Sequence, residues 1–142
     1  RILKGTNRFE YGEYVYPTST EVVQRLLAWC NDRDIQVVLI IPPYAPSVYE
    51  RMVESGNYGY FDWIPKILTE LCEPYGYEVY DFSYMPDTSD DEYIDGYHGG
   101  DRVYARLTRQ LAEQSTILEG LIDTDYLDAA LADSGNPLRL AQ

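Results

Sequence analysis

The sequence predicts an α/β fold with three layers, in which helices cover a parallel sheet. One observation is the apolar, β-branched run at residues 35–41, which ends at Pro42 and Pro43 and is typical of a strand buried on both faces. A second is the shorter, alternating run at residues 77–82. Helical patterns lie between the two runs. We therefore expect the strands to pair in parallel through a helical crossover.

Apolar residues recur with a helical period before, between and after these strands. The first helix is expected to start within residues 17–21, where Thr18 and Glu21 have the spacing of a capping box, and to end near Asn31. Pro65 would mark the first turn of the main part of a later helix. The further helices are expected at residues 47–55, 60–73, 101–114 and about 124–133. Residues 2–3 are interpreted as the end of a strand, and residues 5–7 as a turn.

The length of 142 residues fits a single domain, with a core at residues 1–114 and a helical tail at residues 115–142. No apolar run is long enough to predict a transmembrane helix. The two cysteines, Cys30 and Cys72, each lie in a helical apolar pattern, so we expect buried free thiols.

The net charge of −13 argues against binding to nucleic acid or to an anionic membrane surface, because both would repel the chain. Tyrosine is frequent, at 15 residues. Its flat rings with a polar tip suit sugars and acyl chains, but they also fill the core and its edges in many proteins. Composition leaves both interpretations open.

His98 is the only histidine, and Asp95 precedes it by three residues. A carboxylate that accepts a hydrogen bond from Nδ1 of a histidine fixes its tautomer and leaves Nε2 able to take a proton from a nucleophile. Gly96 and the pair Gly99-Gly100 would permit the tight backbone that this needs. The alternative is an aspartate that caps the following helix, beside a surface histidine.

The block Asp95-Gly96-Tyr97-His98, followed by residues 99–107, resembles the last conserved block of the SGNH (GDSL-like) hydrolases and acyltransferases. That block has the form Asp-Gly-x-His, then a few small or polar residues and an aromatic residue in the final helix. Tyr104 stands at the aromatic position. Val103 replaces the usual glycine. The resemblance implies that His98 is the catalytic base and that Asp95 orients it.

Two other segments agree with the order of the family's blocks. Residues 35–43 resemble the strand that precedes the Asp-His block, and residues 77–82 resemble the next strand. Gly5-Thr6-Asn7 is similar to the family's Gly-x-Asn-Asp block, which implies that Asn7 donates to the oxyanion. Arg8 departs from the aspartate of that block, and a plain turn is the alternative.

The family's nucleophilic serine lies in an N-terminal Gly-Asp-Ser-like block, and no such block is present here. Ser47 directly follows a predicted strand, but Pro46 and the order of the family's blocks argue against it. We therefore expect the chain to be the C-terminal half of an SGNH-like domain, with an incomplete flavodoxin-like parallel sheet. It would be inert alone and would pair with its missing N-terminal half or with another copy.

Two weaker patterns remain. Asp87, Asp90, Asp91 and Glu92 could bind Ca²⁺, but they lack the EF-hand pattern, and a solvated acidic loop is the favoured interpretation. Tyr44, Tyr84 and Tyr97 follow the predicted strands and would lie on the active face, where they could line a substrate groove.

The resemblance implies an esterase or O-acyltransferase that acts on acylated carbohydrate or a cell-surface polymer, without metal or cofactor. A bacterial, extracytoplasmic or cell-envelope location would suit such an activity. The alternative is a non-catalytic carbohydrate-binding or interaction module on the same scaffold.

Overall fold

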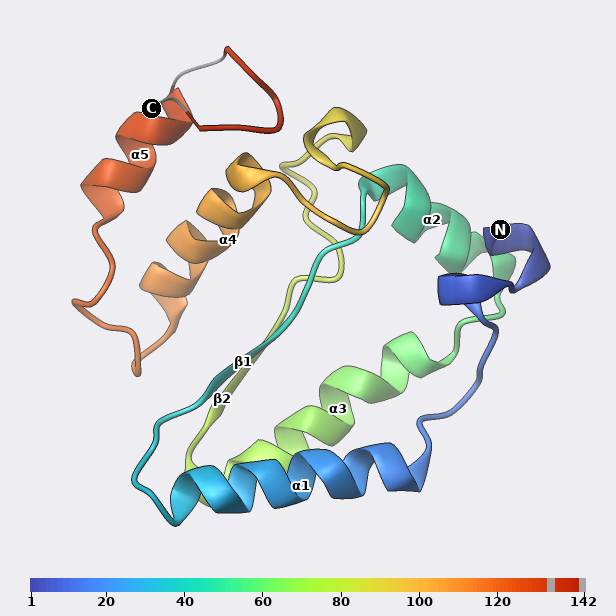
Figure 1. Ribbon diagram of the computed structural model, residues 1–142, viewed down its shortest axis with the longest axis vertical. Coiled ribbons are helices and arrows are strands. Elements are labelled where there is room, and N and C mark those ends of the chain that lie inside the picture. Colours follow the sequence, from blue (N-terminus) through green and yellow to red (C-terminus); the bar gives the residue numbers. More distant parts are fainter. Residues whose placement is uncertain (133–134, 141–142) are drawn as a thin grey trace. The chain divides into compact units, whose positions relative to one another are not determined.

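The computed structural model describes all residues except 133–134 and 141–142, and the described chain is α/β. It contains five α-helices and one small parallel sheet of two strands (Figure 1). In chain order these elements are α1 (Pro17–Asn31), β1 (Val38–Ile41), α2 (Pro46–Ser55), α3 (Tyr60–Cys72), β2 (Glu78–Asp81), α4 (Asp101–Gln114) and α5 (Thr124–Ala132).

The chain divides into two compact units. The first comprises Arg1–Ile41 and Glu50–Asp81, and the second comprises Pro42–Tyr49 and Phe82–Gln142. The chain therefore leaves the first unit directly after the last residue of each strand. Helix α2 begins in the second unit and ends in the first.

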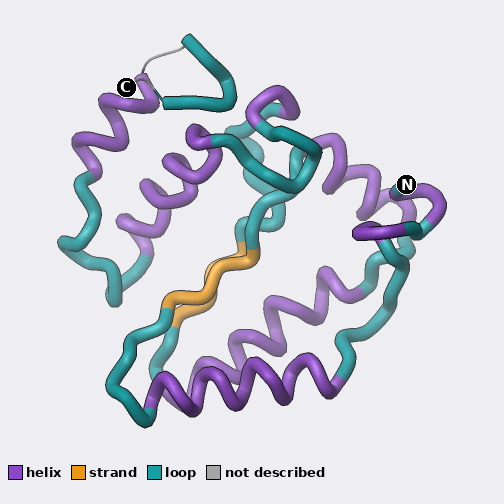
Figure 2. The backbone as a smooth tube through the Cα atoms, viewed as in Figure 1, coloured by secondary structure: helices purple, strands orange, loops and turns teal. Residues whose placement is uncertain are grey.

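The sheet belongs to the first unit. β1 and β2 run side by side (Figure 2). They pair in parallel, from Val38 opposite Glu78 to Ile41 opposite Asp81, which confirms the predicted parallel pair. The strand predicted at residues 35–41 is confirmed from Val38 to Ile41, but its predicted burial on both faces is wrong. The N–H of Ile35 donates to the carbonyl oxygen of Cys30 near the end of α1, so Ile35 belongs to the connection before the strand. All four residues of β1 are half-buried, since each strand has a single neighbour in the described chain.

The core of the first unit joins α1, α3 and the residue that precedes β2. Leu27 and Cys30 of α1 pack with Cys72 of α3 and with Tyr77. The Tyr77 hydroxyl donates a hydrogen bond of 2.8 Å to the carbonyl oxygen of Ile35. Both cysteines are buried and free, as predicted.

Helices α1 and α3 start where the sequence predicts, but two details of their first turns differ. Helix α1 has Tyr16 as its N-cap residue and no capping box, and it begins at Pro17, whose fixed φ suits the first helical position. Helix α3 begins at Tyr60, so Pro65 lies inside the helix rather than in its first turn.

The predicted strand end at residues 2–3 is also wrong. These residues lie in a short 3₁₀ helix, Ile2–Lys4, which ends at Gly5 in the left-handed conformation. The turn expected at residues 5–7 is therefore the end of this helix and the start of the next, Asn7–Phe9.

In the second unit, α4 packs beside α5. Helix α4 has the predicted boundaries, and its buried stripe contains Val103, Leu107 and Leu111. Helix α5 matches the prediction to Ala132, and the last predicted residue, 133, lies outside the described residues. None of the helices in the described ranges is long and apolar enough to cross a membrane.

Candidate functional site

The predicted base lies in a tight loop between β2 and α4. Tyr93 and Gly99 form an isolated antiparallel bridge across the base of this loop. The N–H of Ile94 donates to the carbonyl oxygen of His98 at 2.8 Å, and the N–H of Gly100 donates to that of Glu92 at 2.7 Å. These bonds close the loop and hold its two ends together.

Asp95 and His98 meet within this loop. Oδ2 of Asp95 lies 2.7 Å from Nδ1 of His98. Oδ1 of the same carboxylate accepts the backbone N–H groups of His98 at 3.0 Å and Tyr97 at 3.4 Å. One oxygen thus shapes the turn while the other contacts the imidazole. The alternative of a helix-capping aspartate is wrong, because Gly100 is the N-cap residue of α4 and no side chain caps it.

The electrostatics of the pair favour an ionised carboxylate. Desolvation acts to raise the pKa of Asp95, but the hydrogen bond from His98, the two backbone N–H bonds and the charge of His98 together lower it below its ordinary value. The side chains of His98 and Asp95 are 53% and 39% exposed, so the pair is open to solvent. An ionised aspartate at Nδ1 places the acceptor lone pair of neutral His98 at Nε2, on the other side of the ring.

Glycines are required on both sides of His98. Gly96 has φ +90°, and a Cβ there would lie 2.8 Å from Cγ2 of Val48. Its carbonyl oxygen also accepts the N–H of Ala45 at 2.8 Å, which ties the loop to the segment before α2. A Cβ on Gly99 would lie 2.8 Å from Cγ1 of Val103. Larger residues at either position would displace the loop that holds His98.

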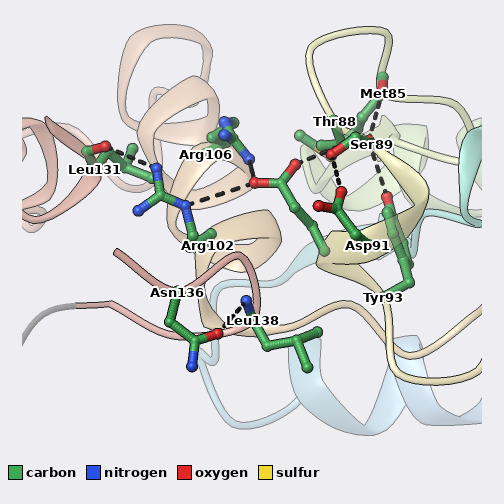
Figure 3. A network of polar contacts seen from close by, with 11 residues as sticks. Met85, Thr88, Ser89, Asp91, Tyr93, Arg102, Arg106, Leu131, Asn136 and Leu138 are labelled. Atoms are coloured by element: carbon green, nitrogen blue, oxygen red, sulfur yellow. Dashed lines mark hydrogen bonds and ion pairs between the residues drawn. The ribbon is translucent and has the colours of Figure 1, made fainter. Parts of the chain in front are cut away.

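The sequence did not reveal the residue that anchors this loop, which is Glu92. Its side chain is buried and lies 2.6 Å from Nη1 of Arg106 and 3.6 Å from Nε of Arg102. Arg102 also donates to the carbonyl oxygen of Leu131 in α5 (Figure 3). The two arginines are four residues apart on α4. That spacing was the only signal in the sequence that both could reach one acid.

The predicted acidic loop is a short 3₁₀ helix, Asp90–Glu92, rather than an irregular segment. Ser89 and Glu92 form a capping box around it. Asp90 accepts the backbone N–H of Ser47 at 3.0 Å, and Asp91 accepts the Ser89 hydroxyl. Each of the acids at 90–92 thus bonds to other residues of the chain. In the part of the chain that the structure describes, no group of three or more acidic, histidine or cysteine residues could hold a metal ion.

The backbone brings together the loops that carry the three predicted substrate-binding tyrosines. The N–H of Tyr44 donates to the carbonyl oxygen of Ser83, beside Tyr84, and Ala45 bonds to Gly96, beside Tyr97. The ring of Tyr97 lies 4.4 Å from that of His98, between centroids.

The other two tyrosines lie in different surroundings. Tyr84 packs at 5.0 Å against Tyr49, between ring centroids. Tyr44 is half-buried, and burial raises the pKa of its hydroxyl. Tyr97 is therefore the tyrosine for which a direct contact with the candidate base is shown.

Asn7 and Ser47 belong to different units of the chain. Asn7 belongs to the first unit, where it is exposed and begins a short 3₁₀ helix with φ +60°. Its role as an oxyanion donor stays a prediction. Ser47 lies in the first turn of α2 in the second unit, and its backbone N–H bonds to Asp90.

Comparisons of the chain with protein-family models, with curated proteins and with solved structures found no match. The features of this chain that point to a function are the Asp95–His98 pair and the sequence block that contains it.

Proposed function

We propose that this chain supplies the acid–base half of an SGNH-like esterase or O-acyltransferase. The observation that carries the proposal is the contact of 2.7 Å between Asp95 Oδ2 and His98 Nδ1. It is the arrangement that a histidine base needs, because the carboxylate fixes the tautomer and stabilises the imidazolium that forms.

In the proposed reaction, Nε2 of His98 takes the proton of a serine hydroxyl as the serine oxygen attacks the ester carbonyl carbon. The tetrahedral adduct then collapses, the bond to the leaving alkoxide breaks, and His98 returns the proton to that oxygen. Water, or another hydroxyl in the case of transfer, then attacks the acyl carbon as Nε2 of His98 takes its proton. The bond to the serine oxygen breaks, and His98 returns the proton to that oxygen. Asp95 stays ionised throughout and acts on the orientation and charge of His98.

We further propose that the serine is supplied by polypeptide outside residues 1–142, and that β1 and β2 belong to a larger, flavodoxin-like parallel sheet. In the described residues each strand has one partner, and the whole of β1 is half-buried. Additional parallel strands would cover the remaining backbone groups at the sheet edge. The substrate class proposed from the resemblance is acylated carbohydrate or a cell-surface polymer.

The test is hydrolysis of p-nitrophenyl acetate by the full-length protein and by the His98→Ala and Asp95→Asn variants. Each substitution should lower kcat by about 10²-fold or more. Arg109→Gln, which alters ion pairs with the exposed carboxylates of Glu113 in α4 and Asp128 in α5, is the matched control and should leave the rate unchanged. Undiminished hydrolysis in His98→Ala would remove this histidine from the mechanism.

A fluorophosphonate probe followed by peptide mapping tests the nucleophile. Labelling should fall on a serine outside residues 1–142 and should be weaker in His98→Ala. Labelling of Ser47 would overturn the proposed source of the nucleophile. Absence of both labelling and hydrolysis in the full-length protein would favour a non-catalytic binding module.

A further inference from the structure

The first unit contains a groove of about 470 Å³, which no part of the proposed catalytic chemistry uses. It lies between residues 10–17 and the first turns of α1 and α3. Its lining includes four tyrosines and two glutamates: Tyr11, Tyr14, Tyr16, Tyr60, Glu10 and Glu13. The volume falls within the range of sites for small ligands. We call it the tyrosine groove.

The wall formed by residues 10–17 is attached to the start of α3. The N–H of Gly12 donates to the carbonyl oxygen of Asn57 at 3.1 Å, and the carbonyl oxygen of Gly12 accepts the N–H of Tyr60 at 3.3 Å. A Cβ on Gly12 would lie 3.3 Å from the Tyr60 ring. Backbone bonds and close packing thus hold the two sides of the groove together.

Two of the tyrosine rings that line the groove also pack against Tyr58. Tyr58 is buried, and its hydroxyl lies within hydrogen-bond distance of the carbonyl oxygens of Ile2 (2.9 Å) and Phe9 (3.0 Å). Tyr11 and Tyr60 both make edge-to-face contacts with Tyr58, at 5.5 and 5.9 Å between centroids. These contacts orient two of the lining rings before any ligand binds, which lowers the ordering cost of binding.

Gly5 places Tyr11. It has φ +55°, and a Cβ at Gly5 would lie 2.7 Å from Cγ of the Tyr11 ring. The ring therefore packs directly on the glycine backbone. The other rings remain accessible: Tyr16 is 78% exposed and Tyr14 is 71% exposed, so their faces can receive a ligand.

The charges of the groove select the chemistry of the ligand. Both of its ionisable side chains other than tyrosine are carboxylates, and no lysine, arginine or histidine is among the residues described as lining it. The face of a tyrosine ring carries partial negative charge. An anion would be repelled, whereas a cation would be attracted both by the two carboxylates and by the ring faces. The net charge of −13 attracts a cation from a distance.

We propose that the tyrosine groove binds an organic cation, with an alkylammonium or guanidinium group over the tyrosine faces and beside Glu10 and Glu13. The proposal is independent of the ester chemistry, because every residue that it uses belongs to the first unit and the Asp95–His98 pair belongs to the second.

The test is calorimetric titration of the protein at low ionic strength with two cationic probes, choline and N-acetyl-arginine amide. At least one should bind with a Kd on the order of 1 mM, and the uncharged choline analogue 3,3-dimethylbutanol should bind at least about tenfold more weakly. The choice between the probes distinguishes a quaternary ammonium ligand from a basic side chain of a peptide. Cellobiose is titrated in parallel, to test whether the groove binds an uncharged sugar instead.

Substitutions of groove residues test whether the cation binds in the tyrosine groove. Tyr16→Leu and Glu13→Gln should each weaken binding by about threefold or more. Tyr126→Leu and Glu119→Gln make the same changes at exposed positions of the second unit and should leave the Kd unchanged. Urea midpoints of all four variants exclude unfolding as the cause. His98→Ala should bind the cation with an unchanged Kd. The cation site is therefore tested separately from the proposed catalysis, and failure of one proposal would leave the other standing.

Four results would overturn the inference. Equal binding of choline and 3,3-dimethylbutanol would show an apolar groove without charge selection. Binding of cellobiose without either cation would show a sugar site. Absence of binding by every probe, or equal weakening by the control variants, would show that the tyrosine groove does not bind organic cations.

Discussion

Oε1 of Glu92 lies 2.6 Å from Nη1 of Arg106, and the carbonyl oxygen of the same glutamate accepts the N–H of Gly100. One residue therefore joins the side chains of α4 to the loop that holds Asp95 and His98. The loop is positioned by a buried acid at its first end and by the helix that follows it.

Substitution of Glu92 should destabilise the second unit. In Glu92→Gln the two arginines lose a buried carboxylate, which costs about 3–5 kcal/mol when one partner of a buried pair is removed. Urea unfolding followed by near-UV circular dichroism measures the change. Glu113→Gln is the matched control, because Glu113 pairs with Arg109 on the exposed side of α4 and should cost less than about 1 kcal/mol. Equal costs would contradict the role of Glu92 as an anchor.

Gly96→Ala should disturb the loop through both its φ and its neighbour. The positive φ and the approach of 2.8 Å to Val48 together should cost about 1–3 kcal/mol. Gly120→Ala is the comparison, since Gly120 has φ +71° but nothing within 4 Å of the added Cβ. Its cost should be smaller. Adding Val48→Ala to Gly96→Ala should recover part of the loss in a double-mutant cycle, and strict additivity would exclude the clash.

The pH dependence of the pair follows from the lowered pKa of Asp95. The ionised carboxylate is favoured in the folded state, so its contribution to stability is complete above the unfolded pKa, about 3.9. That contribution should be lost as the pH falls through the lower folded pKa. Carboxyl ¹³C NMR measures the midpoint directly. His98→Ala removes the side-chain bond and its charge, and should raise the Asp95 midpoint towards the ordinary value. An unchanged midpoint would show that the imidazole does not bond to this carboxylate in solution.

The two adjacent leucines of α1 test the core of the first unit. Leu27 is 1% exposed and packs in the cluster with Cys30 and Cys72, whereas Leu26 is 58% exposed. Leu27→Ala should cost about 2–5 kcal/mol, because it leaves a cavity. Leu26→Ala should change the free energy of unfolding by no more than about 0.5 kcal/mol. The urea midpoints of the two variants measure these changes in stability. A larger loss of stability in Leu26→Ala than in Leu27→Ala would mean that α1 presents its other face to the core.

Sequence patterns predicted the secondary-structure elements and the candidate base more accurately than they predicted tertiary contacts. The predicted boundaries of α4 agree with the structure, because helical periodicity and Gly100 mark them locally. The Asp95–His98 contact was also predicted, since three residues and a glycine suffice to bring the two side chains together. The capping box expected at Thr18 and Glu21 does not form, because Tyr16 is the N-cap residue and Pro17 is the first residue of α1.

The sequence by itself determined the α/β class, the parallel pair and the candidate dyad, because each depends on residues close together in the chain or on a simple alternation of apolar segments. Only the tertiary structure decided the partners of Glu92, the half-buried state of β1 and the packing of Tyr11 on Gly5 and Tyr58. Those features depend on contacts between residues that are far apart in the sequence. Hydrophobic periodicity and turn residues report local conformation and do not specify such tertiary contacts.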